Sequence, residues 1–257
     1  ADGNLAWRRP MFPCSIPAVA VGDVDGDGTP EIGYGEVVMF TPPHVALLSA
    51  DGTVRWHHTI NEETTWLHLE EGALYHGGYA SGARGHVTKR NVEDGSPIFL
   101  RHIDPVIESE DPLISRDGWS RYGTAVPDRN DDGIVELAVS TDGAYLHLVD
   151  GATGASLWTV DLDPVADERG MRRQSGPVLY VPETETTPAW LAVAHSAGVR
   201  SPGTSFALDL DGNVVGEVPM LADAMAISLV HDGDRLGAAV GAGLGLYLLE
   251  AVPVEGP

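Results

Sequence analysis

The sequence is poor in several features, and each shortage excludes a class of protein. Its 257 residues include a single cysteine, so an internal disulfide cannot form and a disulfide-stapled fold is excluded. No apolar run reaches the length of about 18 residues that a membrane-spanning helix needs, and we expect no membrane insertion. Fifteen basic residues stand against 38 acidic ones. The resulting net charge of −23 argues against nucleic acid as a partner, because phosphates require a basic face.

Glycine and proline are plentiful, with 31 and 18 residues, and 43% of the chain is hydrophobic. This composition favours many short strands that are joined by tight turns. A chain of this length buries a large core, and all-β proteins of this size often form one domain. We therefore expect a single all-β domain over residues 1–257.

Two acidic segments, residues 19–35 and 124–140, repeat one pattern of oxygen-bearing side chains. Counted from the first aspartate, oxygens recur at positions 1, 3, 5 and 9, and glycine stands at position 6. Calcium takes about six to eight oxygen ligands, and alternate residues converge on one ion only where the chain turns sharply. The position-7 carbonyl would complete each cage. The pattern predicts two calcium sites: Asp23, Asp25, Asp27, Thr29 and Glu31 in the first, and Asp128, Asn130, Asp132, Ile134 and Glu136 in the second.

The flanks and the closing acid distinguish these segments from an EF-hand. An EF-hand closes with glutamate at about position 12 between two helices. Here the glutamate comes at position 9, and β-type sequence precedes and follows the loop. This combination resembles the FG-GAP or VCBS repeat of integrin-α-like calcium-binding β-propellers, over about 20 residues at each site. The resemblance implies calcium ions that serve as structural staples, and secretion or a periplasmic or cell-surface location. The first site, with four carboxylates against three, is expected to bind calcium more tightly. For the second site, an acidic turn that binds nothing remains an alternative.

A second repeat runs through the whole chain. Asp-Gly or Thr-Gly turns are followed four residues after the glycine by Trp7, Trp56, Phe99, Trp158 and Gly216. Hairpins with such turns are a strong β signal, and a repeat of about 40–60 residues with four short strands is typical of a propeller blade. The turn-tryptophan pattern also resembles the quinoprotein-like blade. The expected inner strands are residues 17–22, 64–69, 122–127, 176–181 and 225–230.

These counts predict a five-bladed β-propeller that is closed by its N-terminal strand. The last expected strand, residues 244–250, has no following turn-tryptophan strand, whereas residues 2–9 form one with no preceding blade. Pairing residues 2–9 into the fifth blade would remove the free sheet edges. A truncated array with an unpaired end is the alternative.

Polar and aromatic residues gather where we expect the loops of the opposite propeller face. The candidate ligand-binding residues are His76, Tyr79, Arg84, His86, Trp119, His195 and Arg200. A long connection over residues 101–122 exceeds ordinary loop length, which favours a binding loop or lid. Histidines can instead serve packing alone, and no nucleophile or zinc-protease motif is present.

Two functional classes follow from this reading. The first is a monomeric extracellular binding or adhesion module, stabilised by calcium, that recognises a glycan or a protein. The second is a secreted polysaccharide lyase or hydrolase with a His/Tyr/Arg site on the top face. We favour the module and assign no catalytic residue. Fold alone does not decide between them, because propellers host both classes.

Overall fold

The computed structural model describes most of the chain. The described residues are 7–8, 15–38, 42–80, 84–103, 120–141, 143–162, 174–185, 187–196, 203–220, 224–232, 235–242 and 245–250. All regular structure within them is β-strand, and none of them forms a helix long and apolar enough to cross a membrane. The chain divides into two compact units, residues 1–104 and 105–257.

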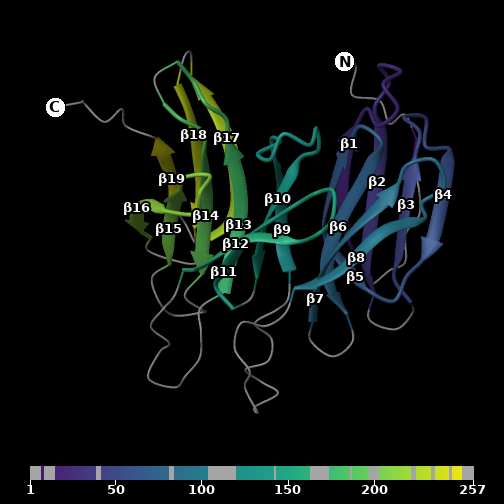
Figure 1. The fold of residues 1–257 in the computed structure, drawn as a ribbon, viewed down its shortest axis with the longest axis horizontal. Coiled ribbons are helices and arrows are strands. Elements are labelled where there is room, and N and C mark those ends of the chain that lie inside the picture. The colour runs from purple at the N-terminus through teal and green to yellow at the C-terminus, as the bar shows by residue number, and fades with distance from the viewer. Residues whose placement is uncertain are drawn as a thin grey trace, which may run out of the picture. The chain divides into compact units, whose positions relative to one another are not determined.

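The first unit contains two four-stranded antiparallel sheets (Figure 1). Sheet 1 consists of β1 (Ser15–Gly22), β2 (Glu31–Val38), β3 (His44–Leu48) and β4 (Val54–Thr59). Sheet 2 consists of β5 (Glu63–Glu70), β6 (Ala73–Ala80), β7 (Arg84–Asn91) and β8 (Pro97–Ile103).

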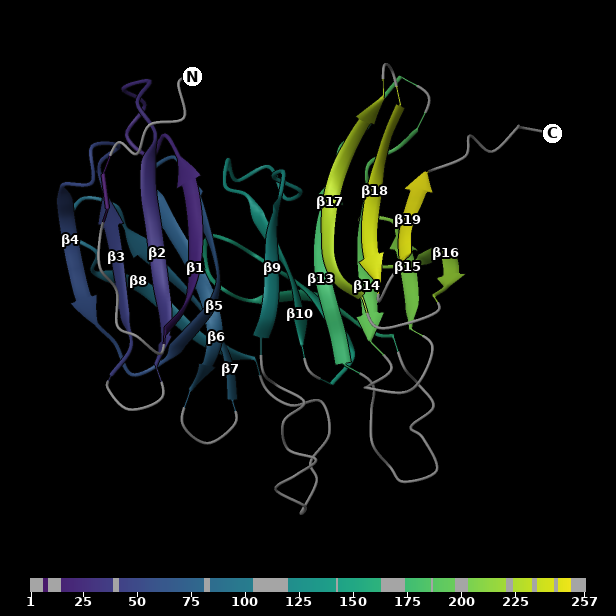
Figure 2. The same ribbon diagram turned by 180° about the vertical axis from the view of Figure 1, so that it is seen from behind.

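The second unit contains three antiparallel sheets (Figure 2). Sheet 3 consists of β9 (Ser120–Val126), β10 (Glu136–Thr141), β11 (Tyr145–Val149) and β12 (Ser156–Asp161). Sheet 4 consists of β13 (Gln174–Val181), β14 (Trp190–Ser196), β15 (Thr204–Leu208) and β16 (Val214–Pro219). Sheet 5 has three strands among the described residues: β17 (Ala224–Asp232), β18 (Arg235–Ala242) and β19 (Gly245–Glu250).

Each sheet is a meander in which consecutive strands are neighbours. The five strands expected to be inner strands are confirmed as strands β1, β5, β9, β13 and β17, each the first strand of its sheet. Middle strands are buried on both faces: every residue of β10 and β11 is buried. The last strands, such as β16, are mostly exposed. Such burial requires sheets that stack face to face, which explains the near-continuous apolar runs of the middle strands.

Packing between neighbouring sheets forms the core of each unit. In the first unit, Leu47 and Trp56 of sheet 1 meet Leu69 and Leu74 of sheet 2. In the second unit, separate clusters join sheet 3 to sheet 4 and sheet 4 to sheet 5. The core is therefore a series of apolar layers between sheets.

Three tryptophans cover the tight turn of the following repeat. Their indole N–H groups donate to backbone carbonyls: Trp7 to Ala50 at 2.9 Å, Trp56 to Val92 at 2.8 Å and Trp158 to Leu210 at 3.1 Å. The turn glycine lies against the ring in each case. At Gly95, which has φ 72°, a Cβ would come within 2.7 Å of the Trp56 ring. The turn therefore needs glycine both for its left-handed backbone and for the close approach of the ring.

Candidate functional site

The two acidic segments form the connections that join the first and second strands of sheets 1 and 3. We call residues 23–31 loop 1 and residues 128–136 loop 2. Since strands alternate in direction, the connection between the third and fourth strands lies at the same end of each sheet. Gly28 and Gly133 have φ of 82° and 80°. These left-handed conformations make the sharp turn that the sequence pattern predicts.

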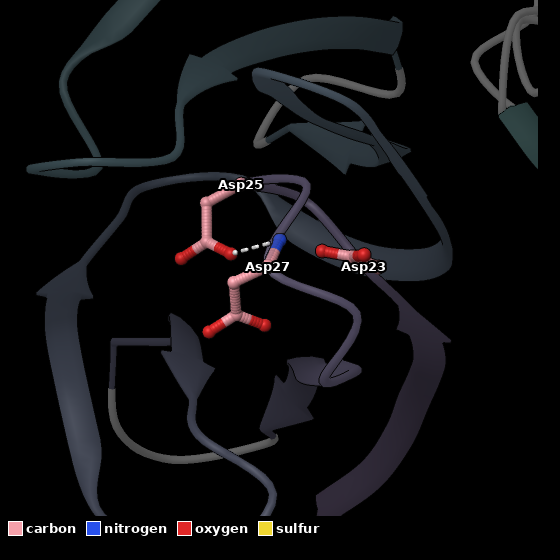
Figure 3. Close-up of side chains that lie close together, drawn as sticks. All are labelled: Asp23, Asp25 and Asp27. Carbon is pink, nitrogen blue, oxygen red and sulfur yellow. Dashed lines mark hydrogen bonds between the residues drawn. The ribbon is translucent and has the colours of Figure 1, made fainter.

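Loop 1 is folded around its own carboxylates. Asp23 accepts hydrogen bonds from the amides of Gly26 and Gly28, both at 2.8 Å, and Asp27 accepts one from Thr29 at 2.6 Å. Figure 3 shows the side chains of Asp23, Asp25 and Asp27, with the Asp27 amide 3.4 Å from an Asp25 oxygen. One oxygen from each carboxylate lies within 4.8 Å of the others. This exposed cluster could bind a metal ion.

Loop 2 repeats this hydrogen bonding position by position. Asp128 accepts from Gly133 at 2.6 Å, Asp132 from Ile134 at 2.8 Å, and Asn130 from Asp132 at 3.1 Å. Each bond has its counterpart in loop 1. The sequence repeat therefore corresponds to a repeat of loop conformation.

The glutamates at position 9 are the first residues of β2 and β10, and both are buried. Glu31 is 3% exposed and Glu136 is 0% exposed. One oxygen of each accepts a bond from the amide at position 2: Val24 to Glu31 at 3.1 Å, and Arg129 to Glu136 at 2.8 Å. In both loops this leaves a single carboxylate oxygen for another partner.

The second glutamate oxygen distinguishes the two loops. In loop 1, Glu31 Oε1 lies 3.2 Å from the Arg55 guanidinium, which also reaches Asp25 at 2.8 Å. In loop 2, Glu136 Oε1 is buried and has no hydrogen-bond partner among the described residues. Burial raises the pKa of Glu136 to about 7, and the negative charges of Asp128 and Asp132 add to this shift. A buried carboxylate oxygen that faces other acids fits a bound cation.

Position 2 of each loop also contacts the next sheet. Val24 is buried in the core between sheets 1 and 2, and its carbonyl accepts a 2.8 Å bond from Gly72 of the β5–β6 turn. Arg129 reaches Asp211, in the β15–β16 turn of sheet 4, at 2.7 Å. Ordering either loop therefore orders a contact between neighbouring sheets.

The candidate ligand-binding histidines lie inside strands, not in the connections where we expected them. His76 of β6 and His86 of β7 have ring centroids 5.5 Å apart, and both are 0% exposed. His76 receives a 3.0 Å hydrogen bond from Arg90 and lies 3.3 Å from the Thr64 hydroxyl. Burial, together with the neighbouring His86 and Arg90, holds the pKa of His76 well below its usual value.

The remaining candidates are scattered. His195 of β14 is 0% exposed and meets the Phe206 ring edge-on. Tyr79 is half-buried near the end of β6, and Arg84 begins β7, although its side chain lies outside the description. Trp119 and Arg200 also lie outside the described residues. The structure thus brings His76 and His86 together, and it buries both.

Sequence reasoning missed the contacts of Arg55 and Arg90. Arg55 stands directly before Trp56 in the turn motif, at the sheet end that carries loop 1. The alternation of strand direction was enough to place it there. Arg90 gave no comparable signal, because its contact with His76 depends on cross-strand register.

Comparisons with known proteins show the fold and no more. No family model matches the sequence, and no curated protein is a significant match. Among solved structures, Sqt1 from Saccharomyces cerevisiae has a TM-score of 0.61 at 12% identity, over 94% of this chain and 60% of that one. BBS1N in complex with ARL6DN has a TM-score of 0.59 at 11% identity, over 97% and 67%. The Dos1 propeller has a TM-score of 0.52 at 11% identity, over 81% and 50%.

The chain has a β-propeller fold. It spans 60% of Sqt1 and 50% of the Dos1 propeller chain. At these identities the similarity assigns no family. The resemblance to the FG-GAP or VCBS repeat therefore rests on the sequence pattern of the two loops alone.

Proposed function

We propose that this chain is a calcium-stabilised five-bladed propeller that acts as an extracellular binding module for a glycan or a protein. The buried oxygen of Glu136, which has no hydrogen-bond partner among the described residues, is the observation that carries the calcium assignment. Leaving a buried charge without a partner is costly, and a cation held between it and the loop aspartates removes that cost.

The proposed ligand sets are those of the sequence pattern, and the three aspartates of loop 1, which lie close together, support the first of them. In loop 1 they are Asp23, Asp25, Asp27, Glu31 and the carbonyl of Thr29; in loop 2, Asp128, Asn130, Asp132, Glu136 and the carbonyl of Ile134. All are oxygen donors, as calcium prefers. Because position 2 of each loop also contacts the next sheet, bound calcium would stiffen the seam between blades. The proposed ions are thus structural.

Closure of the ring is supported by Trp7. Its ring and N–H contact the sheet 1 turn at Gly52 and Ala50 as Trp56 contacts the turn of sheet 2. By this analogy, Trp7 belongs to the outer strand of the blade that precedes sheet 1. Sheet 5 is the one described sheet with three strands. Residues 2–6 and 9 lie outside the described residues, and we propose that residues 2–9 form the fourth strand of sheet 5.

The burial of the histidines favours the binding module over the lyase or hydrolase. A general base must reach the proton that it abstracts, whereas His76, His86 and His195 are 0% exposed. Their positions instead suit packing between sheets. The ligand surface is then formed by other residues of the face opposite the calcium loops. A monomeric protein outside the cytoplasm fits this role.

A binding screen tests the proposal. The protein should be applied to glycan and extracellular-protein arrays in millimolar calcium and again in excess chelator. We expect a ligand that is retained in calcium and lost in chelator. Cleavage of acidic polysaccharides by the protein would instead establish the enzyme. Equal binding in both buffers would contradict the stabilising role of calcium.

A further inference from the structure

Arg55 pairs with the closing carboxylate of loop 1. The Arg55 guanidinium lies 2.8 Å from Asp25 and 3.2 Å from Oε1 of Glu31. The other oxygen of Glu31 is already engaged by the Val24 amide. Oε1 is therefore the oxygen that remains for a cation, and Arg55 occupies it.

Loop 2 has no such internal cation at the corresponding position. Arg55 stands three residues after its turn glycine and directly before Trp56. The equivalent residue in sheet 3 is Leu157, three residues after Gly154 and directly before Trp158, and its side chain is 43% exposed. Glu136 Oε1, the counterpart of the oxygen that Arg55 holds, has no hydrogen-bond partner among the described residues.

The two loops consequently carry the same formal charge. Four ligand carboxylates and the Arg55 guanidinium give loop 1 a formal charge of −3, the same as the three ligand carboxylates of loop 2. The surplus carboxylate, which made loop 1 the expected tighter site, is offset by Arg55. Because Glu31 is buried, water screens its attraction to Arg55 less than it screens the attraction within an exposed ion pair.

We propose that Arg55 is a built-in counter-ion that makes loop 1 the weaker of the two calcium sites and leaves loop 2 the tighter one. Calcium enters loop 1 only by displacing the guanidinium from Glu31. The protein therefore holds one calcium ion at low concentration and takes up the second as the concentration rises. This inference rests on the proposed calcium function.

The substitutions Arg55→Leu and Leu157→Arg, which exchange the two side chains between the loops, test the counter-ion role. Asp128→Ala isolates loop 1, and Asp23→Ala isolates loop 2. In these backgrounds, calcium affinity is measured by titration calorimetry and occupancy by native mass spectrometry. Arg55→Leu should tighten loop 1 roughly tenfold, and Leu157→Arg should weaken loop 2 by a similar factor.

Melting curves that are recorded in excess chelator give a readout that does not depend on calcium affinity. In excess chelator, Arg55→Leu should lower the melting temperature, because Asp25 and Glu31 lose their cation, and calcium should restore it. Arg55→Gln, which keeps hydrogen-bonding capacity but no charge, should behave in the same way and covers the case in which the leucine variant does not fold.

The outcomes separate the two proposals. If both loops bind calcium but neither Arg55→Leu nor Arg55→Gln changes the calcium affinity of loop 1, the counter-ion role is overturned and the calcium function stands. Failure of every variant to bind calcium would overturn both. With Arg55 and Leu157 both in place, tighter calcium binding in loop 1 than in loop 2 would also contradict the proposed order of affinities.

Discussion

His86 should make the protein acid-labile, by an amount that can be worked out from its surroundings. The side chain is 0% exposed, and neither ring nitrogen has a hydrogen-bond partner among the described residues. Burial lowers the pKa of His86 to about 3, and His102 and the Arg90 charge act in the same direction. The folded protein therefore keeps this imidazole neutral across the physiological range.

The sign of the effect follows from proton binding. The unfolded chain, with a histidine pKa of about 6.5, takes up a proton as the pH falls, whereas the folded protein does not until about pH 3. The contribution of the neutral His86 side chain to the unfolding free energy is fully present above pH 6.5 and is lost as the pH falls towards 3. At about 1.4 kcal/mol per pH unit, His86 alone costs about 2 kcal/mol of unfolding free energy at pH 5 and about 3 kcal/mol at pH 4.

Urea denaturation of the wild type and of His86→Leu, at a series of pH values between 7 and 4, measures this term. The difference between the two proteins cancels the other titrating groups. At pH 7, leucine should be tolerated, because it removes two buried nitrogens that have no hydrogen-bond partner among the described residues. At pH 5, the variant should gain about 2 kcal/mol relative to the wild type.

His231 provides the control because it is exposed in β17. His231→Leu makes the same substitution at an exposed position and so controls for the loss of a histidine as such. If His86→Leu and His231→Leu give the same pH profile, His86 is not buried as the structure has it, and the reasoning fails.

Three further predictions concern the tryptophan contacts, loop 2 and ring closure. Trp56→Phe keeps a ring but removes the hydrogen bond to Val92, so the unfolding free energy in denaturant should fall by about 1 kcal/mol; an unchanged value would mean that the bond contributes nothing. Glu136→Gln should raise the melting temperature in chelator, because it removes the charge of a buried carboxylate whose Oε1 has no hydrogen-bond partner among the described residues, and it should shrink the gain that calcium gives; a variant that melts as the wild type in both buffers would refute this. Deleting residues 1–9 should expose the edge of β19 and produce aggregates or oligomers on size-exclusion chromatography; a monomer with an unchanged melting point would show that these residues close no blade.

The sequence predicted the parts of the fold that depend on local pattern. Turn glycines followed by tryptophan placed the hairpins, because the glycine conformation and the ring that covers it are set within a few residues of the turn. Loops 1 and 2 were equally predictable, because the hydrogen bonds within each loop join residues at most seven positions apart.

Burial between sheets was harder to predict. His76 and His86 were expected in a loop that faces a ligand, but β6 and β7 extend far enough to include both. Their burial depends on how one sheet stacks on another. The role of Arg55 was missed for a related reason: its partners lie 24 and 30 residues away in the chain, and only antiparallel strand direction brings them together.

A crystal structure of the protein grown in excess calcium, with anomalous diffraction recorded to locate the metal, tests the central claim most directly. Our account predicts one calcium ion in each loop, with oxygen ligands at about 2.3–2.6 Å, the Glu136 Oε1 atom bound to the metal, and the Arg55 guanidinium withdrawn from Glu31. Water at both positions, with calcium present in the crystal, would contradict it.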